Sequence, residues 1–202
     1  MTELSFIHRY EPAGATGRRP VLLLHGTGGD EADLLSLGRA VAPGSALVSP
    51  RGKVLEHVMP RFFRRLAEGV FDEDDLRRRA DELADFVGEA RAAYDLEAPI
   101  ALGFSNGANI AAALLLLRPE VLAGAVLLRA MPPLAAPPPA DLGAKRVLLV
   151  SGSGDPILPV DSARTLAAHL TARGAEVDHR ILPVGHGLSQ ADVTLAQAFL
   201  AG

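Results

Sequence analysis

Three residue types that can cooperate in acyl transfer lie far apart in this sequence: a serine between glycines, an aspartate in a loop and a histidine near the end. The serine is Ser105 in Gly103-Phe104-Ser105-Asn106-Gly107, which matches the G-x-S-x-G pattern of a nucleophile elbow. A sharp strand-to-helix turn strains the serine backbone there, and glycines on both sides avoid collisions. Ser105 is therefore a candidate nucleophile, the alternative being an ordinary glycine-bounded turn.

A serine nucleophile needs a base, and six histidines compete for that role. His186 lies in Pro183-Val184-Gly185-His186-Gly187, between the last predicted strand and the last predicted helix. Functional groups of open parallel sheets gather at such carboxyl ends of strands. His25 also follows a strand, but we interpret it as structural, packing beneath the loop that it opens. The remaining histidines fall on an edge strand, a loop, a helix and a strand: His8, His57, His169 and His179.

The residue that would orient the base is Asp155, in the loop that follows the predicted strand at 146–150. Taken alone, Gly154-Asp155-Pro156 has the chemistry of an ordinary turn aspartate. Taken with Ser105 and His186, each at a separate strand end, it completes the order Ser, Asp, His that is typical of α/β hydrolases. The combination favours a catalytic triad.

A glycine-rich loop, His25-Gly26-Thr27-Gly28-Gly29, follows the first buried apolar run. Its glycines allow the Thr27 amide to point at a developing oxyanion, beside the Asn106 amide. The loop lacks the third glycine of a dinucleotide fingerprint, and neither a phosphate-binding G-x-x-x-x-G-K-[ST] nor a histidine pair with metal-binding spacing occurs. We therefore expect an oxyanion hole formed by Thr27 and Asn106, with no cofactor and no metal.

The elements that must position these residues alternate between strands and helices. The continuous apolar run at 21–24 predicts a strand buried on both faces, and further strands are predicted at 46–48, 99–103, 122–128, 146–150 and 177–182, with a short edge strand within 4–10. Helices are predicted around 34–41, 72–94, 163–170 and 189–200, and directly after Ser105. Asp72 and the pair Ser189 and Asp192 have the spacing of helix N-terminal caps. This alternation predicts a single α/β domain over 1–202 with a mostly parallel sheet.

Two segments lack such periodicity. Arg51 to Phe71 is predicted to be irregular, and Met131 to Ala140 contains too many prolines for a helix or a strand. We interpret the proline-rich segment as a surface connection within the domain.

Composition excludes several classes of function. The 202 residues carry a net charge of −4, which disfavours nucleic acid or an anionic membrane as the main partner. The sequence has no cysteine, which rules out disulfides and a cysteine nucleophile. No apolar run reaches the ~18 residues of a membrane span. Met1-Thr2-Glu3-Leu4 shows no start of a secretory signal, so we expect a cytoplasmic protein.

The chain resembles the phospholipase/carboxylesterase family of α/β hydrolases, which includes acyl-protein thioesterases, and within it the small bacterial carboxylesterases. The resemblance rests on motifs in the expected order: 25–31, Pro50-Arg51-Gly52, 59–63, 103–107, 154–159 and Gly185-His186. It implies an α/β-hydrolase fold with helices on both faces of the sheet and no large lid domain. It also implies a serine carboxylesterase with Ser105 as nucleophile, His186 as base, Asp155 as its orienter, and the Thr27 and Asn106 amides as oxyanion donors. The implied substrates are small to medium esters, with thioesters as a second class, and a homodimer is suggested by the resemblance alone.

The segment between Pro50 and Phe71 departs from the thioesterase pattern through two adjacent phenylalanines, Phe62 and Phe63, and four arginines, Arg51, Arg61, Arg64 and Arg65. Because this region lies over the pocket in the family, the resemblance places Arg51, Met59, Arg61, Phe62 and Phe63 in the substrate pocket. An arginine-lined mouth would favour a substrate with a carboxylate. The alternative, which we prefer, is that the arginines pair with the acidic residues Glu68 and 72–75.

Two other functions stay open at this point. The first is a non-catalytic binding or regulatory protein on a hydrolase scaffold, because a fold does not fix a function. The second is lactone hydrolysis of the dienelactone type, which ranks low because those enzymes use a cysteine and this chain has none.

Overall fold

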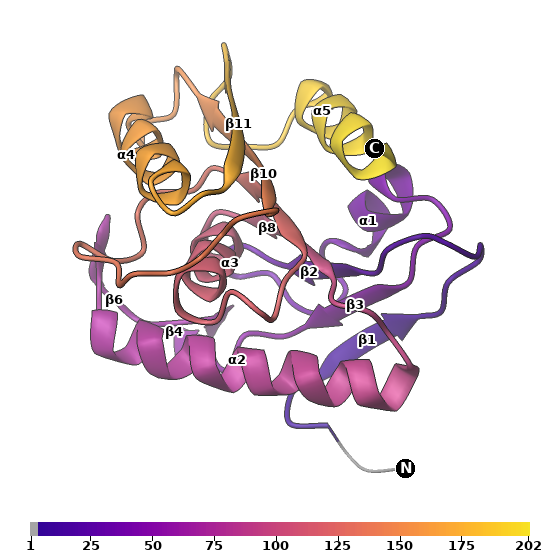
Figure 1. Cartoon of the computed structure of the whole chain (residues 1–202). Coiled ribbons are helices and arrows are strands. Elements are labelled where there is room, and N and C mark those ends of the chain that lie inside the picture. Colours follow the sequence, from indigo (N-terminus) through magenta and orange to yellow (C-terminus); the bar gives the residue numbers. More distant parts are fainter. Residues whose placement is uncertain (1–3) are drawn as a thin grey trace.

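A seven-stranded sheet forms the centre of the computed structural model, which describes residues 4–202 (Figure 1). Its strand order is β1-β3-β2-β8-β9-β10-β11, and all neighbours are parallel except β1, which pairs antiparallel with β3. The strands are β1 (His8–Glu11), β2 (Val21–Leu24), β3 (Leu47–Pro50), β8 (Ile100–Phe104), β9 (Gly124–Leu128), β10 (Arg146–Gly152) and β11 (Glu176–Leu182). The predicted mostly parallel sheet with an edge strand near the N-terminus is confirmed. The expectation drawn from residues 1–3 lies outside the described residues.

Side chains of the central strands alternate between two separate apolar cores. In β2, Leu22 and Leu24 belong to one core, whereas Val21 and Leu23 belong to the other. All four are at most 1% exposed. Burial on both faces explains why these strands are continuous apolar runs rather than alternating ones.

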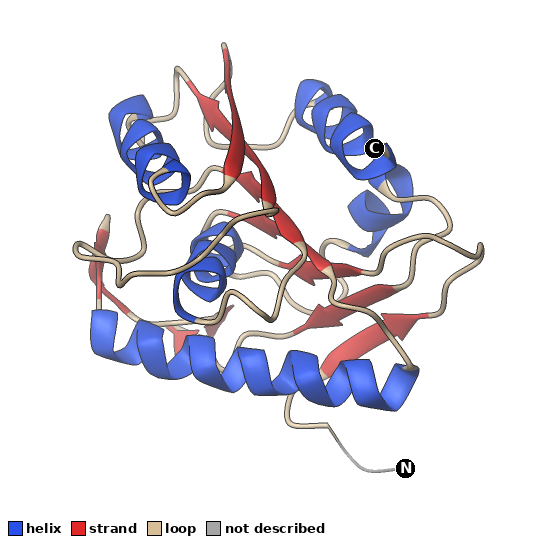
Figure 2. Ribbon diagram, in the orientation of Figure 1, coloured by secondary structure: helices blue, strands red, loops and turns tan. Residues whose placement is uncertain are grey.

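Five helices cover the two faces of the sheet (Figure 2). Helices α2 (Glu73–Tyr94) and α4 (Val160–Thr171) contribute apolar stripes to the first core, and α3 (Asn106–Leu117) is buried on nearly all sides within it. Helices α1 (Leu35–Val41) and α5 (Gln190–Ala201) pack against each other and on the second core. The chain therefore has the α/β-hydrolase architecture, with no large lid. Within residues 4–202, no helix combines the length and apolar character that a membrane crossing requires.

The predicted helix caps are present. The Asp72 carboxylate accepts a hydrogen bond from the Asp75 amide at 3.1 Å, at the N-terminus of α2. At α5, Ser189 and Asp192 form a reciprocal capping box. Such caps satisfy amides that the first turn of a helix leaves without partners.

The prediction that residues 51–71 are irregular was wrong in part. Two small hairpins occur there, formed by β4 (Val54–Glu56) with β5 (Met59–Arg61) and by β6 (Arg65–Ala67) with β7 (Val70–Phe71). Their strands have only two or three residues, too few to show an alternating pattern. The first turn uses positive φ at His57 and Val58, residues that give no turn signal in a sequence.

Candidate active site

Ser105, His186 and Asp155 form one hydrogen-bonded chain at the carboxyl ends of the strands. Ser105 Oγ lies 3.0 Å from His186 Nε2, and His186 Nδ1 lies 2.8 Å from Asp155 Oδ2. The three residues follow β8, β11 and β10, respectively. The structure thus brings together the three side chains that the sequence predicts as nucleophile, base and orienter.

Ser105 occupies a strained turn between β8 and α3, with φ 51° and ψ −114°. The glycines beside it are required by close backbone contacts. A Cβ on Gly107 would lie 2.0 Å from the Leu24 carbonyl oxygen, and one on Gly103 would lie 2.5 Å from the Gly107 oxygen. The Ser105 amide donates to the Leu128 carbonyl at 2.9 Å, which fixes the turn to the neighbouring strand β9. The serine hydroxyl is therefore held in a rigid place.

The Asp155 carboxylate is held by three donors. Oδ1 accepts from the amides of Ile157 and Leu158 at 2.8 and 3.1 Å, while Oδ2 faces His186. Burial of this carboxyl acts to raise its pKa, but the hydrogen bonds from Ile157, His186 and Leu158 outweigh burial and lower the pKa of Asp155. The group is therefore ionised at neutral pH and can only accept hydrogen bonds.

An ionised Asp155 determines the tautomer of His186. Because the carboxylate accepts, Nδ1 of the ring carries the proton, and the lone pair of Nε2 faces the Ser105 hydroxyl. The ring also packs at a tilt against Phe104, with the ring centroids 5.4 Å apart. His186 is thus oriented to accept a proton from Ser105.

Thr27 and Asn106 carry the backbone amides that are the candidate oxyanion donors. Both residues line the same cavity as Ser105 and His186, and no hydrogen-bond acceptor pairs with either amide in residues 4–202. Arg61 Nη1 donates to Thr27 Oγ1 at 2.8 Å, and the Phe62 amide donates to Asn106 Oδ1 at 2.8 Å. Arg61 and Phe62, which are adjacent in the chain, therefore hold the side chains of the two residues of the candidate oxyanion hole.

His25 is buried below the loop and makes two backbone hydrogen bonds. The Gly52 amide donates to Nε2 at 3.0 Å, so the ring proton lies on Nδ1, which donates to the Gly26 oxygen at 2.7 Å. The ring stacks at a tilt on Phe62 at 4.7 Å. These contacts agree with the structural role that we expect for this residue.

The stability of the protein is expected to fall as the pH drops below 6.5, partly because of His25. Burial lowers the pKa of His25 from its ordinary value of 6.5, so below pH 6.5 the unfolded chain binds a proton that the folded chain does not. This contribution is fully present above 6.5 and is lost as the pH approaches the folded pKa. Urea unfolding at pH 7, 6 and 5 should show a smaller pH slope in His25→Gln.

The matched control is His57→Gln, which replaces an exposed histidine at the tip of the β4–β5 hairpin. We expect it to keep the wild-type pH slope of the free energy of unfolding. Equal slopes for wild type and His25→Gln would contradict the assignment.

A cavity of about 370 Å³ opens at Ser105 and His186. Of the five pocket residues that the resemblance suggests, only Arg61 lines it. Arg51 is turned away toward Glu31, Met59 lies against the loop at Gly28, and Phe62 and Phe63 are 3% and 0% exposed in the core. The two aromatic rings gain more from burial than from lining a wet cavity.

Most of the other lining residues are ones that the sequence analysis did not assign to the pocket. They are Arg65, Glu68, Gly69, Phe71, Phe104, Asn109, Met131, Ile157 and Leu158. Four of them could have been predicted from their closeness in sequence to the proposed triad. Phe104 and Asn109 lie near Ser105, and Ile157 and Leu158 lie two and three residues after Asp155. Within residues 4–202, no group of three or more acidic or histidine side chains is placed to hold a metal ion.

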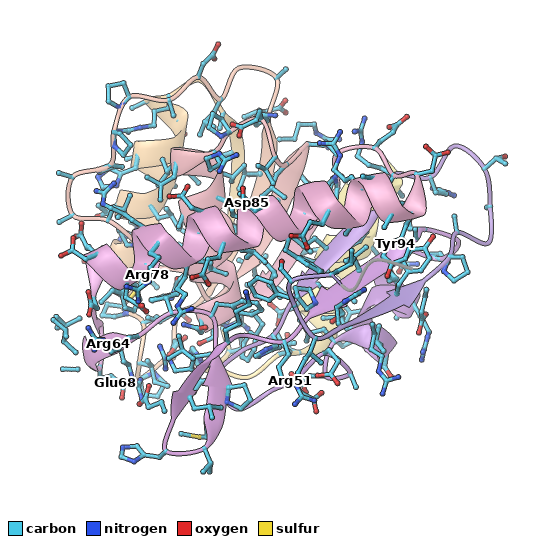
Figure 3. The ribbon with its side chains drawn as sticks, turned by 90° about the horizontal axis from the view of Figure 1, so that it is seen from below. Arg51, Arg64, Glu68, Arg78, Asp85 and Tyr94 are labelled. Atoms are coloured by element: carbon cyan, nitrogen blue, oxygen red, sulfur yellow. The ribbon has the colours of Figure 1, made fainter. Side chains whose placement is uncertain are left out.

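The arginines of residues 51–65 are ion-paired. Arg64 pairs with Asp72, and Arg65 with Glu68 at 3.6 Å, as expected. Arg51 instead pairs with Glu31 at 2.8 Å, and Arg61 and Arg65 share Glu56 at 3.1 and 2.8 Å. Figure 3 shows Arg64 and Glu68 near the N-terminal end of α2, with Arg51 apart from them. The pairing supports the structural interpretation over a general carboxylate-binding mouth.

Comparison with known proteins gives consistent matches over nearly the whole chain. A family model described as Phospholipase/Carboxylesterase matches residues 11–202. The Bacillus subtilis (strain 168) protein named "Putative hydrolase MhqD" is 43% identical over 192 residues, which are 94% of this chain and 95% of that protein.

Solved structures give the same result. The Bacillus cereus carboxylesterase is 41% identical with a TM-score of 0.95, covering 98% of this chain and 94% of that chain. The carboxylesterase from Mesorhizobium loti is 36% identical with a TM-score of 0.94, covering 100% of this chain and 97% of that chain. The similarity therefore extends well beyond the elbow motif.

Proposed function

Because the chain belongs to the phospholipase/carboxylesterase family, a family of hydrolases, we propose that it is a serine carboxylesterase acting through Ser105. The observation that carries this proposal is the continuous chain of hydrogen bonds from Ser105 through His186 to Asp155, opening on a cavity. The strained turn at Ser105 supports the same mechanism, as do Thr27 and Asn106, which line the cavity with backbone amides that pair with no acceptor within residues 4–202.

In the first half of the proposed reaction, Ser105 Oγ attacks the ester carbonyl carbon while its proton moves to His186 Nε2. The carbonyl oxygen becomes negative and accepts hydrogen bonds from the Thr27 and Asn106 amides. The C–O bond to the alcohol then breaks, and His186 returns the proton to the leaving oxygen. The products of this half are the free alcohol and an acyl group bonded to Ser105.

In the second half, water takes the place of the alcohol. His186 Nε2 accepts a proton from the water as its oxygen attacks the acyl carbon, and the same two amides stabilise the oxyanion. Collapse releases the carboxylic acid and returns the proton to Ser105. Asp155 stays ionised throughout and stabilises the positive charge that develops on His186.

The cavity favours small to medium esters. A volume of about 370 Å³ lies near the lower end of the range for ligand pockets. Apolar side chains of Phe71, Met131, Ile157 and Leu158 offer a place for a short acyl chain, whereas Arg61, Arg65 and Glu68 make another part of the wall polar.

We therefore expect the protein to hydrolyse p-nitrophenyl esters with a maximum of kcat/KM at short acyl chains. The experiment is a series of esters from two to twelve carbons, with matched thioesters as a second series. A maximum at the longest chains would contradict the proposed substrate size. A folded protein with no activity on either series would contradict the proposed reaction.

A further inference from the structure

Arg129 contacts the chain on both sides of His186. Its Nε donates to the Gly185 oxygen at 3.0 Å, and its Nη2 donates to the Gly187 oxygen at 3.1 Å. The arginine side chain is 0% exposed. One buried guanidinium therefore holds the two peptide carbonyls that flank the proposed base.

The remaining contacts of Arg129 anchor it to two other elements. Its Nη1 and Nη2 donate to the two oxygens of Asp192 in α5, at 2.8 and 3.0 Å, and Nη1 also reaches the Val150 oxygen in β10 at 3.3 Å. Asp192 in turn accepts from the Ser189 amide and hydroxyl. The loop between His186 and α5 is thereby fixed at both ends.

The backbone around Arg129 also connects this loop to the serine. The residue follows β9 directly, with φ at 59°, a conformation that costs a non-glycine residue energy and is kept only where surroundings impose it. The carbonyl of its neighbour Leu128 accepts from the Ser105 amide at 2.9 Å. The end of β9 thus contacts both the nucleophile turn and the base loop.

Gly185 and Gly187 have more backbone freedom than other residues, so the short segment that carries His186 needs other contacts to hold it in one place. A buried ion pair alone would not restrict that freedom, and such a pair adds little net stability compared with apolar residues of similar size. The contacts to Gly185 and Gly187 do restrict it. They require a planar group with several donors in a fixed fork, which arginine supplies and lysine does not.

We propose that Arg129 is a positioning residue whose guanidinium fixes the Gly185-His186-Gly187 loop so that His186 Nε2 stays within reach of Ser105. This inference rests on the proposed function for its kinetic consequences. Its structural consequence, a fixed His186–Asp155 bond, is independent of which substrate the protein acts on.

The test uses Arg129→Lys, which keeps a cation for Asp192 but cannot serve both carbonyls. We expect kcat to fall by about 10²-fold with KM unchanged, because a misplacement of the base by roughly 1 Å has an effect of that size. The low-field proton NMR signal of the His186 Nδ1–H bonded to Asp155 should weaken or broaden. The control is Arg118→Met, which removes a partly exposed arginine at the end of α3 that lies away from Ser105. It should keep the wild-type kcat and the wild-type low-field signal.

A second variant, Arg129→Met with Asp192→Leu, removes the ion pair without leaving a buried charge. Because Asp192 also accepts from the Ser189 amide and hydroxyl, this variant is expected to lose some stability, but if the role of Arg129 were only structural, its folded form would have wild-type kcat. We expect it to keep the low kcat. Wild-type kcat or an unchanged low-field signal in folded Arg129→Lys would overturn the inference. An inactive wild type that shows the signal would count against the proposed esterase reaction, and loss of that signal in Arg129→Lys would still support the positioning role.

Discussion

Replacing Ser105 with alanine is expected to lower kcat for ester hydrolysis by about 10⁶-fold, because the attacking oxygen is removed while the fold is kept. Alanine fits the space of serine. The hydrogen bond from the Ser105 backbone amide to the Leu128 carbonyl does not involve the side chain, so the variant keeps it. The measurement is kcat on the best p-nitrophenyl ester, with circular dichroism to establish that the variant is folded.

The chain offers a matched control in a second serine–histidine pair. Ser151 Oγ lies 2.7 Å from His179 Nε2, a shorter distance than that between Ser105 and His186. This pair lies on β10 and β11 and does not line the cavity. We expect Ser151→Ala to keep wild-type kcat. Equal losses in the two alanine variants would contradict the assignment of Ser105 as nucleophile.

Replacing Asp155 with asparagine is expected to lower kcat by about 10⁴-fold. The asparagine oxygen can still accept from the amides of Ile157 and Leu158, so the loop should keep its shape. Its NH₂ group would then face His186 Nδ1 and donate to it. The ring proton would move to Nε2, where it prevents the ring from accepting the proton of Ser105.

The control for this variant is Asp161→Asn. Asp161 is an exposed residue in the first turn of α4, and its side chain pairs with Arg164. Its replacement should change kcat little, since an exposed ion pair of this kind contributes at most about 1 kcal/mol. A fall in kcat of less than tenfold in Asp155→Asn would show that the carboxylate does not orient His186.

The sequence predicted those parts of the site that depend on local chemistry. Gly103 and Gly107 are needed because strand and helix backbones touch there, and this requirement is visible as a motif. Asp155 and His186 could be found because each follows a buried strand, and parallel strands end at one edge of the sheet.

The parts that the sequence did not reveal depend on contacts between distant segments. Phe62 and Phe63 belong to a charged stretch that favours a surface position, yet tertiary packing buries both rings. Arg129 meets Asp192 across 63 positions, and no spacing rule connects them. The local sequence shows only that Arg129 is a charged residue directly after the apolar run of β9.

Covalent labelling of Ser105 with a fluorophosphonate tests the central claim most directly. We predict one adduct per chain, located on the peptide that contains Ser105, with none in Ser105→Ala and none in the urea-unfolded protein. Labelling requires the hydrogen bond between His186 and Ser105 to activate the oxygen, so it reports the nucleophile without any assumption about the substrate. A folded wild-type chain that forms no adduct, or forms it on another residue, would contradict a serine hydrolase mechanism at this site.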